Sequence, residues 1–120
     1  MKVIIAGSRD FDDYQKLCKV CDHMLSQQAE VEIVSGAARG ADLLGERYAK
    51  EKGHSIKQFI PDWTIGKSAG YLRNKDMAEY GDALIAFWDG KSKGTLHMIN
   101  LAKERNLKVK VVIYETKESQ

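Results

Sequence analysis

Residues that suit phosphate binding gather in one short segment, Asp89–Thr95, directly after the apolar run Ala83–Trp88. The segment contains Gly90 and Gly94, which can take positive φ and let a ligand approach bare backbone. Its serine and threonine hydroxyls can cap a helix or contact a phosphate, and free N–H groups at a helix start attract anions. The spacing differs from a Walker A loop, since Ile85 stands where that motif needs its first glycine. The segment therefore predicts a phosphate-binding turn between a buried strand and a helix.

Two earlier turns have the same character, and each carries a cation. The turn Gly7–Arg9 follows the β-branched run Lys2–Ala6, and the turn Ser35–Asp42 follows a second apolar run and contains Arg39. Arg73 lies near the start of a later helical segment. Backbone donors combined with guanidinium groups are suited to phosphate recognition. Glycine turns also occur as plain connectors, so a binding site is indicated only if these turns meet at one place in the fold.

Apolar strands and amphipathic helices alternate along the chain. Strands are expected at residues 2–6, 31–34, 55–60, 83–88 and 108–114, and helices from an Asp12 or Asp13 cap to about 28, at 41–52, at 69–80 and at 95–105. Such alternation produces parallel sheets through right-handed crossovers. We therefore predict an α/β fold, a Rossmann-like three-layer sandwich with a five-stranded parallel sheet in the order 3-2-1-4-5 and helices on both faces. Residues 1–114 are expected to form a single domain, followed by a polar tail at 115–120.

Ligands of such sheets bind beyond the carboxyl ends of the strands, where the strand order reverses. In the predicted order this crevice lies between the first and fourth strands, and the glycine turns converge on it. Arginines would neutralise phosphate there, backbone N–H groups would cradle it, and Asn74 or Asp89 would read ribose or base. The residues expected to bind the ligand are Gly7, Ser8, Arg9, Ser35, Gly36, Arg39, Gly40, Asp42, Arg73, Asn74, Asp89, Gly90, Ser92, Gly94 and Thr95.

Several other residues allow two interpretations. Trp63 can stack on a base or pack at a strand end. The carboxylate of Asp42 can face a ligand or favour the dipole of its own helix. Cys18 and Cys21 lie in the middle of a helix among apolar residues, which favours reduced core thiols over a redox pair. Residues expected to face the core in the helix at 69–80 are Leu72, Met77 and Ala78.

Composition excludes several classes of protein. The chain has 120 residues, of which 43% are hydrophobic and 30% charged, with one proline, as in an ordinary globular domain. Its net charge of +2 is too small to indicate nucleic acid, and we do not expect nucleic acid as a partner. No cluster of ligand-type residues indicates a metal site. The chain begins directly in a strand and has no apolar run of membrane-spanning length, so a cytoplasmic protein without membrane contact is expected.

Five motifs occur in an order that resembles a known family. They are Ala6-Gly-Ser-Arg9, Ser35-Gly-Ala-Ala-Arg-Gly-Ala-Asp42, Asp62-Trp63 with Gly66-Lys67 and Ala69-Gly70, Arg73-Asn74 with Met77, and Asp89-Gly-Lys-Ser-Lys-Gly-Thr95. From Lys2 to about Val112 the chain resembles the YspA-like branch of the SLOG superfamily, the Rossmann-like group named for the SMF/DprA and LOG proteins. The resemblance implies a Rossmannoid fold that binds nucleotides or nucleotide-derived ligands, such as ADP-ribose or NAD-related species. Small Rossmannoid domains of this kind often pair through helix faces, so a homodimer is one partner to test, but the sequence itself gives no oligomeric state.

Relatives of the LOG type are phosphoribohydrolases with a Pro-Gly-Gly-x-Gly-Thr-x-x-Glu signature and an arginine before the fourth strand. Here Gly94-Thr95 matches the Gly-Thr pair and Arg73 matches the arginine. Met98 stands at the glutamate position and cannot act as an acid or base. Ala37 stands where relatives usually have glycine. DprA relatives bind single-stranded DNA, but this chain lacks a series of aromatic residues beside a basic groove.

The leading prediction is a sensor or carrier that binds a small nucleotide or nucleotide-derived ligand in the crevice, with no other cofactor. The first alternative is a nucleotide N-glycosidic-bond hydrolase, similar to a LOG phosphoribohydrolase. Its candidate catalytic residues are Asp89 and Arg73, and Asp42 or Glu46 would be further carboxylates for the same role. The second alternative is a DprA-like module associated with single-stranded DNA. The residues leave open whether a bound nucleotide is turned over.

Overall fold

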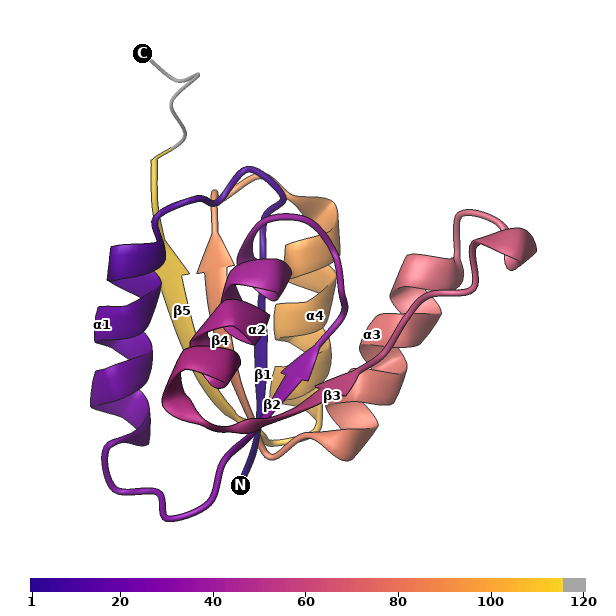
Figure 1. The fold of residues 1–120 in the computed structure, drawn as a ribbon. Helices are drawn as coiled ribbons and strands as arrows, with labels where there is room; N and C mark the ends of the chain where they lie inside the picture. Colours follow the sequence, from indigo (N-terminus) through magenta and orange to yellow (C-terminus); the bar gives the residue numbers. More distant parts are fainter. Residues whose placement is uncertain (116–120) are drawn as a thin grey trace.

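The computed structural model describes residues 1–115, and the predicted polar tail lies outside them apart from Glu115. The elements are β1 (Lys2–Gly7), α1 (Tyr14–Leu25), β2 (Glu32–Ser35), α2 (Ala41–Lys52), β3 (Ser55–Gln58), the 3₁₀ turn η1 (Trp63–Ile65), α3 (Ala69–Tyr80), β4 (Ala83–Trp88), α4 (Lys93–Glu104) and β5 (Lys108–Ile113). The strands form one parallel sheet in the predicted order β3-β2-β1-β4-β5 (Figure 1). The order reverses between β1 and β4, where a ligand crevice is expected.

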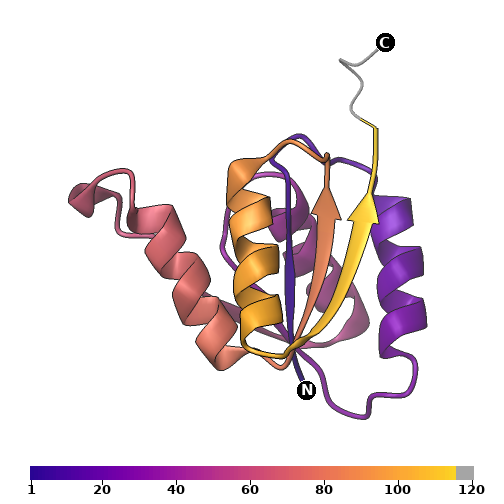
Figure 2. The same ribbon diagram turned by 180° about the vertical axis from the view of Figure 1, so that it is seen from behind.

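The central strands are covered on both faces, as their continuous apolar sequences predict. In β1, Val3, Ile4 and Ile5 are fully buried, and β4 is buried from Ala83 to Phe87. Helices α1 and α2 lie on one face of the sheet, while α3 and α4 lie on the other (Figures 1 and 2). One hydrophobic cluster forms on each face, so the fold is the predicted three-layer α/β sandwich.

Helix α3 leans away from the sheet, and η1 projects with it from the body of the molecule (Figures 1 and 2). Met77 and Ala78 anchor its second half in the core beside α4, as predicted. Leu72 was also predicted to face the core, but it is 49% exposed, and Asn74 is buried instead. Asn74 lies three and four residues before the two anchors and shares their helix face, whereas Leu72 points elsewhere. We call residues 59–73, from the end of β3 into α3, the arm.

Helix α1 and strand β3 both end earlier than predicted. Helix α1 ends at Leu25 rather than near residue 28, because the N–H of Gln28 turns back to the Leu25 carbonyl at 3.1 Å. Strand β3 ends at Gln58 because the partner strand β2 ends at Ser35. The exposed residues 26–30 then connect α1 to β2 at the amino end of the sheet, opposite the end where the strand order predicts a ligand.

Helix α1 has the local features expected from its sequence. Asp13 caps it by accepting a hydrogen bond from the N–H of Lys16 at 3.1 Å. Cys18 and Cys21 lie within it as free thiols, with Cys21 fully buried. None of the helices in residues 1–115 has the length and apolar character needed to cross a membrane.

Candidate functional site

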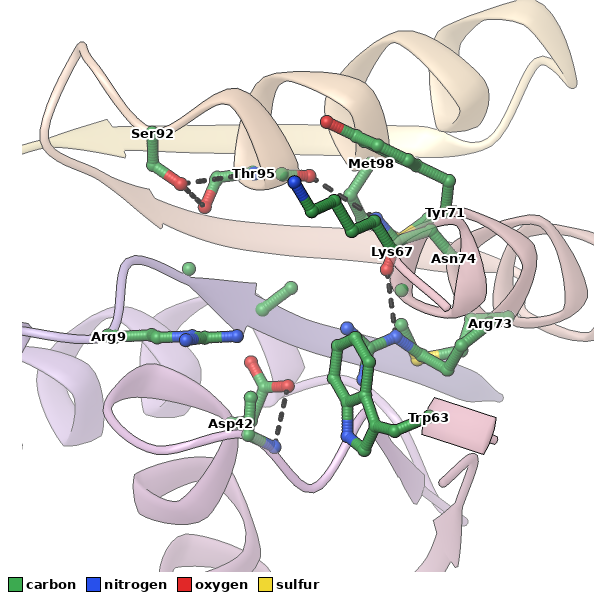
Figure 3. A pocket seen from close by; sticks show the side chains of 16 residues that line it. Arg9, Asp42, Trp63, Lys67, Tyr71, Arg73, Asn74, Ser92, Thr95 and Met98 are labelled. Carbon is green, nitrogen blue, oxygen red and sulfur yellow. Dashed lines mark hydrogen bonds between the residues drawn. The ribbon is translucent and has the colours of Figure 1, made fainter. Parts of the chain in front are cut away.

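A cavity of about 330 Å³ opens at the carboxyl end of the sheet, where the strand order reverses (Figure 3). The end of β1, the first turns of α2 and α4, and the arm with the following turn of α3 all contribute to its wall. Its volume is at the small end of the range for small-molecule sites, about 300–1,000 Å³. The lining residues are Ala6, Gly7, Arg9, Ala38, Asp42, Trp63, Lys67, Gly70, Tyr71, Arg73, Asn74, Met77, Ser92, Gly94, Thr95 and Met98.

The turn that leads into α4 is fixed by its own side chains. Asp89 accepts hydrogen bonds from the N–H groups of Lys91 and Ser92, both at 2.8 Å. Partial burial acts to raise the pKa of Asp89, but these N–H groups lower it overall, so the carboxylate stays ionised. Ser92 caps α4 by accepting from the N–H of Thr95 at 3.3 Å. Asp89 thus stabilises the turn from outside the cavity, and the residues that line the cavity here belong to the start of α4.

Gly94 differs from its predicted conformation. Helix α4 begins at Lys93, two residues before the predicted start, so Gly94 is an ordinary helical residue. Positive φ, 80°, occurs at Gly90 but not at Gly94. A Cβ added at Gly94 would have no atom of residues 1–115 within 4 Å, apart from its chain neighbours and the backbone of its own helix. The glycine therefore leaves the start of α4 open toward the cavity.

Arg73 is held against the turn between β2 and α2. Its Nη1 donates to the carbonyl of Gly36 at 2.5 Å, and its Nε donates to Oδ1 of Asn74 at 3.0 Å. A Cβ at Gly36 would lie 2.6 Å from this Nη1 and 2.8 Å from Oδ2 of Asp42, so a side chain there would displace both groups. Burial lowers the pKa of Arg73 from its usual value and Asp42 acts in the opposite direction, but a guanidinium remains charged at neutral pH.

Asp42 is a nearly buried carboxyl group in the cavity wall. It is 4% exposed, and its Oδ2 accepts a hydrogen bond from the N–H of Ala38 at 3.3 Å. Burial raises the pKa of Asp42 to about 6, while this hydrogen bond and the charge of Arg73 act to lower it. The charge of the cavity wall therefore changes with pH close to neutrality.

Asn74 ties α3 to α4 at the base of the arm. Its Nδ2 donates to the carbonyl of Gly94 at 3.3 Å and lies 3.2 Å from Nδ1 of His97. The ring of Tyr71 packs edge-on against His97, with centroids 4.5 Å apart. The amide oxygen of Asn74 also accepts a hydrogen bond from Nε of Arg73, so the polar groups of the Asn74 side chain are occupied within the protein. Asn74 positions Arg73 and the start of α4 with respect to each other.

Positive charge dominates the cavity. Arg9, Lys67 and Arg73 line it, against the one lining carboxyl group of Asp42. No ion pair within residues 1–115 involves any of these three cations. Figure 3 shows Arg9 on one side of the cavity and Lys67, Arg73 and Trp63 on the other, with Trp63 57% exposed. The same residues 1–115 contain no group of three or more His, Cys, Asp or Glu side chains placed to hold a metal ion.

A second cavity, of about 380 Å³, adjoins the first. The residues that line both cavities are Arg9, Ala38, Trp63 and Arg73. The residues that line the second alone are Gly36, Ala37, Arg39, Ile60 and Pro61. Ala37 has a φ of 60°, which is uncommon for a residue with a side chain.

The structure brings most of the predicted ligand-binding residues to these cavities. Gly7, Arg9, Asp42, Arg73, Asn74, Ser92, Gly94 and Thr95 line the first, and Gly36 and Arg39 line the second. Ser8, Ser35, Gly40, Asp89 and Gly90 line neither. Ser35 is fully buried, where it donates to Glu46 at 2.7 Å and accepts from the N–H of Ala37 at 3.0 Å. Ser8 likewise accepts from the N–H of Asp89 at 3.2 Å, so these side chains shape the turns behind the cavities.

The arm contributes lining residues that were not among the predicted ligand-binding residues. Lys67 and Tyr71 line the first cavity, and the exposed ring of Trp63 lines both. Strand-end rules point only to the turns after strands, so they do not find a helix that leans over the same edge. Two signals in the sequence pointed to the arm: Trp63 and Lys67 belong to one of the five ordered motifs, and the ring of Trp63 can stack on a base.

Comparisons with known proteins agree with this architecture. The family YAcAr, described as the YspA, cpYpsA-related SLOG family, matches residues 1–66, from β1 through η1. DNA processing protein A from Helicobacter pylori, solved to study its binding of single-stranded DNA, has a similar structure with a TM-score of 0.70 and 20% sequence identity. The similarity covers 98% of this chain and 67% of that one, and at this identity it shows a shared fold. Curated protein sequences give no match.

Proposed function

Because the chain belongs to the YspA, cpYpsA-related SLOG family, we propose that its first cavity binds a nucleotide or a nucleotide-derived ligand, as a sensor or carrier. The observation that carries the proposal is the set of cations, Arg9, Lys67 and Arg73, around the start of α4. No ion pair within residues 1–115 neutralises them. Guanidinium groups and the N–H groups of a helix start are the donors that bind phosphate in proteins.

The rest of the cavity supports a nucleotide over inorganic phosphate. Trp63 offers an exposed ring on which a base can stack. The buried side chains of Met77 and Met98 give the cavity an apolar part, which suits the body of a nucleoside. A ligand would thus place its phosphate near Ser92 and Thr95 and its base toward Trp63.

The test is a thermal-shift screen of AMP, ADP, ATP, ADP-ribose, NAD and cyclic dinucleotides, followed by titration calorimetry. A ligand that binds only the native state raises the melting temperature by mass action. Lys67→Ala should weaken the selected ligand, whereas Lys75→Ala should not, because Lys75 is exposed on α3 and lines neither cavity. Arg73→Ala should raise the Kd about ten- to a hundredfold, as for loss of a charged hydrogen bond. No shift with any compound, or equal effects of the two lysine variants, would contradict the proposal.

A second candidate function, hydrolysis of a nucleotide N-glycosidic bond, is favoured by one observation. Asp42 lines the cavity as a carboxyl group with a pKa of about 6, suited to proton transfer near neutral pH. Asp89, the carboxylate predicted for this role, lies outside the cavity. Release of free base from a bound nucleotide, abolished by Asp42→Asn, would establish hydrolysis. If no base is released even at high protein concentration, the protein binds the nucleotide without hydrolysing it.

Single-stranded DNA is the other ligand to test, because the Helicobacter pylori protein of similar fold binds it. Nucleic acid was not the partner expected from the sequence, although a module associated with single-stranded DNA was its second alternative. The exposed ring of Trp63, which lines the cavities with Arg9, Arg39 and Lys67, is the surface that would bind it. Binding of an oligonucleotide should then be weak and fall steeply with salt. A shift by oligonucleotide at low salt, lost in Trp63→Ala, would favour DNA over a small nucleotide.

A further inference from the structure

We propose that His97, which lies on α4 and lines neither cavity, is a positioning residue whose neutral ring fixes the base of the arm, and that protonation of this ring loosens the arm. The inference deepens the proposed function by naming a regulation of the same site. Its effect on a bound anion rests on that function, whereas the contact of His97 with α3 can be tested on the protein without ligand.

The orientation of the Asn74 amide is determined by its two other partners. Its Oδ1 accepts a hydrogen bond from Nε of Arg73 at 3.0 Å, and its Nδ2 donates to the carbonyl of Gly94 at 3.3 Å. A guanidinium group only donates and a carbonyl only accepts, so the reversed amide would be mismatched with both partners. The group of Asn74 that faces His97 is therefore the NH2 group, with Nδ2 3.2 Å from Nδ1 of the ring.

This orientation determines where the His97 ring carries its proton. An amide NH2 group only donates, so Nδ1 of His97 must accept and the proton of the neutral ring lies on Nε2. A second proton would bind at Nδ1 and point at the NH2 group of Asn74. Because two donors would then face each other, either the ring or the amide must turn away. A turned amide would lose its hydrogen bonds with Arg73 and Gly94 as well.

Two residues that line the first cavity depend on this contact. Arg73 is held through Asn74, and the ring of Tyr71 packs edge-on against His97, with centroids 4.5 Å apart and an angle of 74° between the planes. His97 thus supports two lining residues of α3 from behind. Arg73 would keep its hydrogen bond to the carbonyl of Gly36, so protonation of His97 should weaken anion binding without abolishing it.

The surroundings of His97 favour the neutral ring. Its side chain is partly buried, and burial lowers the pKa of His97, while the charge of Glu104, further along α4, acts to raise it. From α3 the groups that face the ring are the aromatic side chain of Tyr71 and the amide of Asn74. The arm should therefore be fixed at neutral pH and loosen as the pH falls below about 6.5, the usual pKa of histidine.

The first experiment follows the isotope-labelled protein by NMR through a pH titration. At pH 7.5 the nitrogen shifts of the His97 ring should place its proton on Nε2. On acidification the side-chain NH2 signals of Asn74 should shift with the same midpoint as His97. This step should disappear in His97→Asn, because an Oδ1 atom in place of Nδ1 accepts a hydrogen bond and does not titrate. The matched control is His23→Asn, exposed on α1, which should retain the step.

The second experiment measures binding of sulfate, a dianion whose charge is constant between about pH 5 and pH 7.5. At pH 7.5, His97→Asn should bind sulfate within about twofold of wild type, and His97→Leu, which lacks the acceptor, about two- to tenfold more weakly. At about pH 5, wild type should bind more weakly than His97→Asn by a similar factor. Protonation of Asp42 changes the charge of the cavity wall in all of these proteins, so the ratio of affinities reports on His97.

Each contrary result has a distinct meaning. A proton on Nδ1 of His97 at pH 7.5, or an Asn74 step that persists in His97→Asn, would overturn the inference. An equal loss of sulfate affinity on acidification in wild type and His97→Asn would overturn it too, because the loss would then belong to another group such as Asp42. If sulfate binds at neither pH while the Asn74 signals follow the titration of His97, the anion site of the proposed function is contradicted and the positioning role of His97 stands.

Discussion

The cavity has two sides that are held in different ways. The side formed by the turns after β1 and β2 is packed into the sheet, with Asp42 4% exposed and a Cβ at Gly7 excluded by the neighbouring backbone. The side formed by the arm leans out from the body, with Trp63 57% and Tyr71 45% exposed (Figure 2). The difference indicates a division in packing, in which the sheet side is held rigidly while the arm, which carries Lys67 and Arg73, adds an exposed contact surface.

The largest expected effect comes from a pair of substitutions that add one methyl group on each side of the cavity, Gly7→Ala on the sheet side and Gly70→Ala on the arm. In Gly7→Ala the new Cβ would lie 2.3 Å from the carbonyl oxygen of Phe87 and 2.7 Å from Cβ of Ala41, so the stability should fall by about 3 kcal/mol or more. In Gly70→Ala the nearest atom, in Trp63, is 3.6 Å away, and helix propensity should raise the stability by up to about 1 kcal/mol. Chemical denaturation measures both, and similar losses would contradict the proposed division.

The next largest effect concerns the charge of Asp42, on the packed side of the cavity, and the stability of the protein at different pH. The pKa of Asp42 is about 6 in the folded chain and about 3.9 in an unfolded one, so the native state binds more protons between these values. Stability should therefore fall as pH rises from about 4 to 6, and at pH 7.5 the ionised group costs up to about 3 kcal/mol. Asp42→Asn should stabilise the protein by up to this amount at pH 7.5 and by little at pH 4.

The matched control for this prediction is Asp76→Asn, because Asp76 is exposed on α3. Thermal denaturation across the pH range measures all three proteins. A lower stability of Asp42→Asn at pH 7.5 would mean that the hydrogen bond from Ala38 outweighs the cost of burying the charge. The ionised carboxylate of Asp42 would then stabilise the packed side of the cavity.

The smallest effect on stability is expected on the arm. Trp63→Ala should change the free energy of unfolding by no more than about 0.5 kcal/mol, because the ring is mostly exposed. It should weaken a bound nucleotide by about 1–3 kcal/mol, the range for loss of one stacked base. Ile65→Ala, also exposed in η1 but outside both cavities, is the control and should change neither quantity. A large loss of stability would show that the arm depends on Trp63 for its position.

The sheet and the turns on it could be predicted from sequence because each signal is local. A short continuous apolar run such as Ala83–Trp88 suits a strand covered on both faces, and a following glycine turn marks its carboxyl end. Right-handed crossovers leave few strand orders, and the one favoured here, which the structure confirms, places Arg9 and the start of α4 at one end of the sheet.

The arm could not be predicted in the same way. Its position depends on how α3 meets α4, through a polar contact from Asn74 to the Gly94 carbonyl and His97. Hydrophobic periodicity assigned Leu72 to the core because it does not register a buried amide that is satisfied by hydrogen bonds. Ser35 and Asp89 were predicted to bind the ligand, but both stabilise turns instead. The sequence could not separate the two roles, because a hydroxyl or carboxylate beside glycine suits a ligand and a backbone turn equally well.

The connection between α1 and β2 has a practical consequence. Residues 26–30 are exposed and lie at the end of the sheet away from both cavities. Insertions are tolerated best in exposed connections of this kind. A biotin-acceptor peptide placed there would attach the protein to a sensor chip with its cavities facing the solution.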